Sequence, residues 1–251
     1  MRQNKYDDPS FFAKYSAMPR SIGGLDEAGE WASFRGLLPD LHDKRVLDLG
    51  CGYGWHCRYA AQQGARAVVG VDLSERMLAK AAELTDERMV RYIRQAIEDV
   101  AFGSGEFDVV VSSLALHYVE RLDTVFQRVW DYLVPGGSLA ISVEHPIFTA
   151  SSEQDWCLNK DGSRKHWPVD DYLREGIRST NWMVENVVKY HRTMATYVNT
   201  LVDAGFRIER LLEPEPTPEL LQRHPDWKDE VRRPMFLLIS ATRSQDDDTE
   251  R

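Results

Sequence analysis

The sequence predicts an α/β fold built on a doubly wound parallel sheet. From residue 44 to residue 143, short β-branched runs alternate with amphipathic helical stretches, which is the pattern of βαβ units. The composition, 43% hydrophobic and 28% charged, is that of an ordinary globular protein, and 251 residues are enough for one sizeable core. We therefore expect a single domain over residues 1–251, with segments added to the sheet.

Seven short apolar runs are predicted to be strands. They are residues 44–50, 66–72, 90–96, 107–113, 137–144, 206–212 and 235–243. A helix is expected at 54–64, where Gly64 is the C-cap, and another at 75–84, where Ser74 is the N-cap. A third is expected at 193–204. Because ligands of such sheets bind at the carboxyl ends of the strands, site residues should directly follow the strands.

Two segments outside this pattern are expected to cover the site, because a bare sheet would leave a bound ligand open to water. The first forms two helices, at 8–17 and 26–37, joined by a turn at 21–24. The second is a long insertion rich in Trp, Tyr and His. The domain then divides into a helical lid (1–40), a ligand-binding half (41–144), a cap (145–191), the completion of the sheet (192–243) and a solvated acidic tail (244–251).

Charge and cysteine content exclude several classes of protein. Forty acidic residues against 31 basic ones give a net charge of -9, so no nucleic-acid partner is expected. Three irregularly spaced cysteines make neither a disulfide framework nor a zinc site, and no histidine pair has metal-binding spacing, so no metal is expected. Residues 1–10 are polar, and no run approaches the roughly 18 apolar residues of a membrane span. We expect a cytoplasmic protein with no membrane partner.

The most informative motif is VLDLGCGYG at residues 46–54, a buried strand that runs into a loop containing Gly50, Gly52 and Gly54. Glycine lets the backbone turn sharply and approach a ligand closely, and this loop leads into a helix N-terminus. The next strand ends in Asp72, 22 residues after Gly50, where a carboxylate can accept hydrogen bonds from a ribose diol. The pair of features predicts a ligand that contains adenosine.

Trp55 decides between two kinds of adenosine cofactor. The dinucleotide fingerprint G-x-G-x-x-G requires a small residue at position 55. An indole there prevents close helix packing and obstructs the place of a pyrophosphate. A cofactor with an amino-acid tail needs no pyrophosphate site, so this kind of cofactor is favoured.

At this point the sequence resembles the class I S-adenosylmethionine-dependent methyltransferases, in particular the small-molecule group of type 11. The residues that carry the resemblance are VLDLGCGYG (46–54), GVDLS (70–74), FDVVVSSLALHYV (107–119) and LVPGG (133–137). The resemblance implies a Rossmann-like, seven-stranded, mostly parallel sheet with an antiparallel last strand. It also implies S-adenosyl-L-methionine as the cofactor and a small molecule as the methyl acceptor.

The resemblance places cofactor-binding residues one by one. Asp48 and the loop Gly50, Cys51, Gly52 and Gly54 would surround the methionine moiety, Asp72 would hold the ribose, and Leu73 would pack beside the adenine. Glu98 and Leu114 would border the pocket, and Tyr15 and Arg20 resemble lid residues, with Arg20 pairing with the cofactor carboxylate. The family often has an acidic residue after the third strand, where this chain has Ala96, so the backbone of Ile97 is expected to make the adenine contact.

A general base is needed only when the acceptor carries a proton on its nucleophilic atom, and histidine suits neutral pH. His117 follows the fourth strand and His191 precedes the helix at 193–204, and each is either a base or a structural histidine. The residues expected to contact an acceptor, each also open to a core or turn role, are Tyr118, His145, Trp167, Tyr190 and Arg192. The aromatic content of the cap suits a planar acceptor.

Two other function classes stay open from the residues alone. One is a non-catalytic protein that binds an adenosyl ligand. The other is a nicotinamide-dependent oxidoreductase, which Trp55 and the lack of a Tyr-x-x-x-Lys dyad disfavour. The runs typical of nucleic-acid methyltransferases are absent, since SSLA stands at 112–115. The leading hypothesis is an enzyme that methylates oxygen or nitrogen of a small molecule by in-line displacement.

Overall fold

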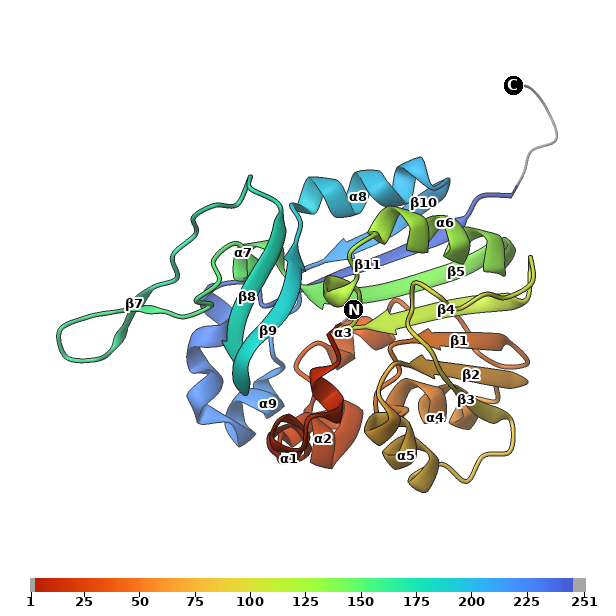
Figure 1. Cartoon of the computed structure of the whole chain (residues 1–251), viewed down its shortest axis with the longest axis horizontal. Coiled ribbons are helices and arrows are strands. Elements are labelled where there is room, and N and C mark those ends of the chain that lie inside the picture. Colours follow the sequence, from red (N-terminus) through yellow and green to blue (C-terminus); the bar gives the residue numbers. More distant parts are fainter. Residues whose placement is uncertain (1–2, 246–251) are drawn as a thin grey trace.

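The computed structural model describes residues 3–245 and contains one seven-stranded sheet (Figure 1). The strand order is β10-β11-β5-β4-β1-β2-β3. The strands are β1 (Arg45–Leu49), β2 (Ala67–Asp72), β3 (Val90–Arg94), β4 (Phe107–Ser113), β5 (Leu133–Glu144), β10 (Phe206–Leu212) and β11 (Phe236–Arg243). β1 to β5 pair in parallel, whereas β11 is antiparallel to both β5 and β10. This confirms the predicted mostly parallel sheet with an antiparallel last strand.

Helices cover both faces of the sheet because its central strands are apolar on both sides. In β1, Val46, Leu47 and Leu49 are all buried, which is typical of a strand that is covered by helices on both faces of its sheet. Helices α4 (Trp55–Gln62) and α5 (Glu75–Glu83) lie on one face, and α6 (Leu122–Tyr132) and α8 (Met194–Asp203) lie on the other (Figure 1). The expected cap of α5 is present, since Ser74 accepts a hydrogen bond from the Met77 N–H.

The N-terminal lid has more elements than the sequence predicts. It contains η1 (Lys5–Asp7), α1 (Pro9–Ser16), α2 (Pro19–Gly23), η2 (Gly24–Glu27) and α3 (Trp31–Arg35). The helix expected at 8–17 is α1, but the helix expected at 26–37 is limited to α3, and the turn expected at 21–24 is wrong. Pro19 begins a helix there because its ring fixes φ in the helical range, and Gly24 ends that helix with a φ of 68°.

The cap contains a short helix, α7 (Pro146–Thr149), and two hairpins. The first hairpin pairs β6 (Cys157–Leu158) with β7 (Arg164–His166), and the second pairs β8 (Gly176–Trp182) with β9 (Val184–His191). Figure 1 shows the β6–β7 hairpin projecting from the body and the β8–β9 hairpin standing beside the lid. The cap therefore reaches the lid through its second hairpin.

Three further elements complete the described chain. Tyr118 and its neighbours form η3 (Leu116–Tyr118), directly after β4. Between β10 and β11, where the sequence pattern predicts no element, the chain forms α9 (Pro218–Arg223) and η4 (Pro225–Arg232). Of the predicted acidic tail, residues 246–251 lie outside the described part of the chain.

Candidate active site

A cavity of about 540 Å³ opens at the carboxyl edge of the sheet, where the sequence predicts a ligand. Its wall is made by the lid, the ends of β1 to β5, the cap and the segment between β10 and β11. The volume lies in the range of small-molecule sites. The predicted site residues that line it are Tyr15, Arg20, Gly50, Cys51, Gly52, Asp72, Leu73, Ile97, Glu98, Leu114, His117, Tyr118 and Tyr190.

The glycine loop follows β1 and is held to the end of β2. The Gly50 and Cys51 N–H groups donate to the Val71 carbonyl at 2.8 and 2.9 Å. A Cβ at Gly50 would lie 2.2 Å from the Ala115 Cβ, and the φ of Gly50 is 80°, so only glycine suits this position. The loop thus brings backbone against the cavity with no side chain in the way.

Asp72 ends β2 beside this loop, and its carboxylate is fixed from two sides. It accepts the Gly52 N–H at 2.9 Å and the Ser74 N–H at 2.8 Å. Burial raises the pKa of Asp72 to about 6, against the hydrogen bonds that favour its ionised form. An oriented carboxylate that lines the cavity can accept hydrogen bonds from a vicinal diol.

Asp48 and Gly54 are placed behind the loop, not in the cavity wall. Asp48 is 1% exposed and accepts the Cys57 S–H at 3.3 Å, and burial raises its pKa to about 7. Gly54 precedes α4 with a φ of 71°, and a Cβ there would lie 2.1 Å from the Tyr92 hydroxyl. Neither residue lines the cavity, although Asp48 Oδ1 has no hydrogen-bond partner among residues 3–245.

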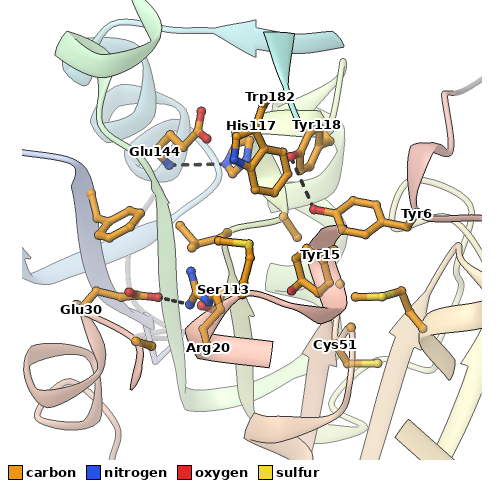
Figure 2. Close-up of a pocket in the computed structure, with 18 of the residues that line it drawn as sticks. Tyr6, Tyr15, Arg20, Glu30, Cys51, Ser113, His117, Tyr118, Glu144 and Trp182 are labelled. Carbon is orange, nitrogen blue, oxygen red and sulfur yellow. Dashed lines mark hydrogen bonds and ion pairs between the residues drawn. The ribbon is translucent and has the colours of Figure 1, made fainter. Parts of the chain in front are cut away.

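A second, charged region of the cavity lies where the lid meets α4. Arg20 donates to Glu30 Oε1 at 2.5 Å (Figure 2), and Glu30 is only 3% exposed. Glu30 Oε2 and the Trp55 Nε1–H have no hydrogen-bond partner among residues 3–245, although both residues line the cavity. Unpartnered buried polar atoms of opposite character in one region are suited to a ligand that carries both an ammonium and a carboxylate.

Aromatic rings dominate the opposite region, around His117. Tyr118 follows His117 in η3, Tyr190 comes from β9, and Tyr6 and Trp182 join them from the lid and from β8. His117 Nδ1 accepts the Glu144 N–H at 3.4 Å (Figure 2), so the proton of the neutral imidazole is on Nε2. Burial lowers the pKa of His117 to about 4, so it is neutral at pH 7.

Beyond the cavity wall, Lys189 supports Glu144. Lys189 is 1% exposed on β9, and its Nζ donates to Glu144 Oε1 at 2.6 Å and to Gln154 Oε1 at 3.2 Å. Burial by itself would raise the pKa of Glu144, but the Lys189 ammonium outweighs it and the pKa is lowered. The ion pair joins the cap to the end of β5.

Besides Asp48 and Gly54, four predicted site residues lie outside the cavity wall, and each has a structural partner. His191 is fully buried, with Nδ1 on the Thr149 hydroxyl and Nε2 donating to the Tyr172 carbonyl. Arg192 donates to the carbonyls of Val119 and Glu120. The His191 ring nitrogens are both engaged, whereas Arg192 Nη1 has no partner among residues 3–245. Neither residue lines the cavity, contrary to the base expected at His191 and the acceptor contact expected at Arg192.

The acceptor contacts expected at His145 and Trp167 are not found in the cavity wall either, because both side chains have structural partners. His145 caps α7 through its Nδ1, which accepts the Ile147 N–H, and its Nε2 contacts Glu213 at 2.8 Å. Trp167 stacks on Phe148 with ring centroids 5.1 Å apart, and the Arg233 guanidinium lies 4.2 Å from its ring. Both residues pack behind Phe148, which lines the cavity in their place.

The residues that sequence reasoning missed come from segments without a motif. Tyr6, Glu30, Phe148 and Trp182 line the cavity, and Lys189 is buried behind it. An isolated aromatic or charged residue carries no spacing signal, so none of these positions stands out. The one available signal is Lys189, which stands between apolar residues of β9. A lysine is almost never fully buried unless it is paired.

The described residues contain neither a metal-ligand cluster nor a membrane-spanning helix. No group of three or more His, Cys, Asp or Glu among residues 3–245 is arranged to hold a metal ion. None of the helices formed by those residues combines the length and the apolar character needed to cross a bilayer.

This chain is similar in sequence and in fold to known methyltransferases. A family model described as a methyltransferase domain matches residues 47–141. A solved structure from Listeria monocytogenes, described as an S-adenosylmethionine-dependent methyltransferase, is 51% identical with a TM-score of 0.83, covering 88% of this chain and 99% of that one. A methyltransferase of the same dependence from Mesorhizobium loti is 44% identical with a TM-score of 0.82, covering 88% and 100%.

A relative from Haemophilus influenzae, an uncharacterized protein, is 36% identical over 244 residues, which is 94% of this chain and 95% of its own length. This chain belongs to the S-adenosylmethionine-dependent methyltransferases. It is an enzyme whose cofactor is S-adenosylmethionine, which confirms the resemblance and the predicted cofactor. The oxidoreductase and the non-catalytic adenosyl-binding protein are thereby set aside.

The residues present fit this cofactor. Asp72 can accept hydrogen bonds from a ribose diol, and the backbone of Gly50 lines the cavity with it. The unpartnered Glu30 Oε2 and the Arg20 guanidinium supply one group for the ammonium and one for the carboxylate of a methionine moiety.

Proposed function

We propose that this methyltransferase transfers its methyl group to oxygen or nitrogen of a small, planar molecule. The observation that carries the proposal is the closure of the lid and the cap over the cavity. Lys14 Nζ donates to the Met183 carbonyl at 2.6 Å, and Gln3 Nε2 donates to the Asn186 carbonyl at 2.7 Å. The Val188 N–H in turn donates to Gln3 Oε1 at 2.9 Å.

These contacts join two segments that are more than 160 residues apart in the sequence, across the mouth of the site. The lid is also fixed to the sheet, because the Ser74 hydroxyl donates to Asp7 at 2.5 Å. A protein loop or a duplex would have to separate the lid from the β8–β9 hairpin to enter. A small molecule fits within the cavity, where aromatic rings offer stacking surfaces.

The residues of this chain would promote transfer mainly by holding and enclosing the reactants. The cofactor supplies an electrophilic methyl group when it is bound. Asp72, the glycine loop, Arg20 and Glu30 would hold the cofactor, and the rings of the lid and cap would align the acceptor and exclude water. Alignment alone can lower the barrier by several kcal/mol. The Nε2–H of neutral His117 is available to a polar group of the acceptor.

The test uses methyl-labelled S-adenosylmethionine with three pools from a cell extract: a low-molecular-weight filtrate, protein and nucleic acid. We expect the label in the filtrate. Label that enters protein or nucleic acid and not the filtrate would overturn the proposal. Asp72→Ala is the control for dependence on the cofactor site, because it removes the predicted ribose acceptor.

The two hairpins of the cap provide a matched pair of variants. Trp182→Ala, at the end of β8, opens the wall of the cavity and should lower transfer. Replacing residues 157–166 with a short Gly/Ser turn removes the β6–β7 hairpin, none of whose residues lines the cavity, and should leave transfer close to normal.

A further inference from the structure

Four aromatic rings from four segments form a box in the cavity wall (Figure 2). The rings are those of Tyr6 in η1, Tyr15 in α1, Tyr118 in η3 and Trp182 in β8. Tyr6 stands edge-on to Tyr15, with centroids 5.3 Å apart at 78°, and edge-on to Tyr118, at 6.2 Å and 89°. Tyr15 is in turn edge-on to Trp182, at 6.5 Å and 82°. All four residues line the cavity, and the buried Phe11, which does not line it, packs against Tyr6, Tyr15 and Trp182.

The box lies between the two regions of the site. Asp72 contributes to raising the pKa of both Tyr6 and Tyr15, after the larger effect of burial, so the ribose acceptor is within electrostatic reach. Glu144 contributes in the same way at Tyr118, on the acceptor side. Asp72, Glu144 and all four rings line the same cavity, so the box faces both regions.

Electrostatics at the box favour positive charge. Burial keeps the hydroxyls of Tyr6 and Tyr118 protonated, since it raises the pKa of each, so the rings present neutral π faces. The cavity wall carries seven carboxylates, those of Glu27, Glu30, Asp72, Glu98, Glu120, Glu144 and Glu230. Its cations are Lys5 and Arg20, while burial lowers the pKa of His56 to about 3 and of His117 to about 4.

The two cations of the cavity wall already have hydrogen-bond partners. Arg20 is bound to Glu30 at 2.5 Å, and the Lys5 Nζ donates to the Glu185 carbonyl. Outside the wall, Lys189 lies 5.3 Å from the Trp182 ring centroid, but Glu144 neutralises it at 2.6 Å. Arg192, also outside the wall, donates to the carbonyls of Val119 and Glu120. An acceptor carboxylate or phosphate would lose its hydration in a wall where carboxylates outnumber cations seven to two.

We propose that the box of Tyr6, Tyr15, Tyr118 and Trp182 holds positive charge during transfer, and that the acceptor is therefore an amine. This inference rests on the proposed function, of which it names the substrate class. Aromatic faces bind cations through the ring quadrupole, and sulfonium and ammonium groups are both cations.

The charge balance of the reaction separates amines from other acceptors. The amine releases its ammonium proton to solvent, and its lone pair then forms the N–CH3 bond while the C–S bond breaks with its electron pair on sulfur. Positive charge passes from sulfur to nitrogen and is conserved throughout. With a phenolate or a carboxylate the same step cancels the charge, so a box that stabilises cations would favour the reactants over the transition state.

The first test measures the cofactor side by calorimetry and needs no acceptor. The quantity is the ratio of the Kd for S-adenosylhomocysteine, which lacks the charge, to the Kd for S-adenosylmethionine. We expect Tyr6→Leu and Trp182→Leu each to lower this ratio by about two- to thirtyfold, the range of cation–π contributions. Tyr6→Phe keeps the ring and should leave the ratio close to that of the wild type.

S-adenosylhomocysteine affinity is an internal control, because a variant that merely misfolds loses both ligands and keeps the ratio. A ratio that is unchanged in both leucine variants would overturn the proposed role of the box.

The second test measures the acceptor side with matched probes. Binding of 2-phenylethylamine, 3-phenylpropionate and 4-ethylphenol to the enzyme saturated with S-adenosylhomocysteine is compared by calorimetry. We expect the amine to bind at least about tenfold more tightly than the other two, and Trp182→Leu to remove that preference. A carboxylate or phenol that binds as well as the amine, or an amine that does not bind, overturns the substrate class. Such results leave the small-molecule proposal standing, whereas label in macromolecules only would overturn that proposal itself.

Discussion

The two ends of the cavity are built in different ways. The cofactor end is made by backbone, with glycines in left-handed conformation after the carboxyl end of β1 and the Asp72 carboxylate beside them at the end of β2. The aromatic end is made by side chains that the lid, η3 and the cap bring together from distant parts of the chain. Requirements on the backbone restrict which residue can occupy a position, whereas a wall of side chains can be assembled from many sequences. A short sequence motif therefore identifies the methyl donor, whereas no motif identifies the methyl acceptor.

The largest effect on the cofactor end is expected when a side chain is placed in the glycine loop. Gly50→Val would force a branched side chain into Ala115 at a φ of 80°. We expect a loss of S-adenosylhomocysteine affinity of more than about 4 kcal/mol, because strain and overlap add. Gly162→Ala is the matched control: its φ is 82°, but nothing lies within 4 Å of the added Cβ. It should cost about 1 kcal/mol of stability and leave affinity unchanged. Calorimetry that finds the same affinity in both variants would show that the loop is not the cofactor site.

The same contrast explains which parts of the fold and of the site could be predicted from the sequence. The sheet was predictable strand by strand, since buried parallel strands are continuous apolar runs, and the helix after β2 begins at a recognisable cap residue, Ser74. The lid was not, because Pro19 and Gly24 redistribute short helices that have little periodicity of their own. At the site, Gly50, Cys51, Gly52 and Asp72 line the cavity as expected, whereas Gly54 does not. His191 and Trp167 also lie outside the cavity wall, because aromatic residues in a cap serve the core as readily as a ligand.

The buried ion pair between the cap and β5 is the next largest test. Lys189→Met leaves the Glu144 carboxylate buried without its partner, and we expect a loss of about 3 to 5 kcal/mol in the free energy of unfolding. Adding Glu144→Leu should recover most of that loss, since an apolar pair of similar volume replaces the ion pair. Denaturant unfolding of the single and double variants measures the coupling. A single variant as stable as the wild type would mean that the cap does not depend on this pair.

Asp48 tests the loop from its buried side. The pKa of Asp48 is about 7 in the folded protein and near 4 in the unfolded chain, so between these values the folded state binds the extra proton. Stability from this group therefore rises as pH falls from about 8 to 4. We expect Asp48→Asn to be more stable than the wild type at pH 8, by on the order of 2 kcal/mol, and the difference to vanish near pH 4.

The measurement is the difference in the free energy of unfolding between Asp48→Asn and the wild type at each pH. His56 and His117 make stability change with pH in the opposite direction, but both are present in both proteins and cancel in the difference. S-adenosylhomocysteine affinity should change little, since Asp48 does not line the cavity. A large loss of affinity would instead show that Asp48 contacts the cofactor.

The smallest effect is expected at His117, the one predicted base that lines the cavity. Its pKa of about 4 leaves it neutral from pH 6 to pH 9, and Nδ1 already accepts the Glu144 N–H, so the cavity receives a donor and not a base. Nitrogen-15 NMR should show the Nε2–H tautomer across this range. His117→Gln should lower kcat by about fivefold, as for the loss of one neutral hydrogen bond, without changing the shape of the pH profile. A loss of a hundredfold or more, together with a pH profile that loses an ionisation near neutrality, would make His117 the general base after all, because only a proton acceptor with a pKa near the working pH has that signature.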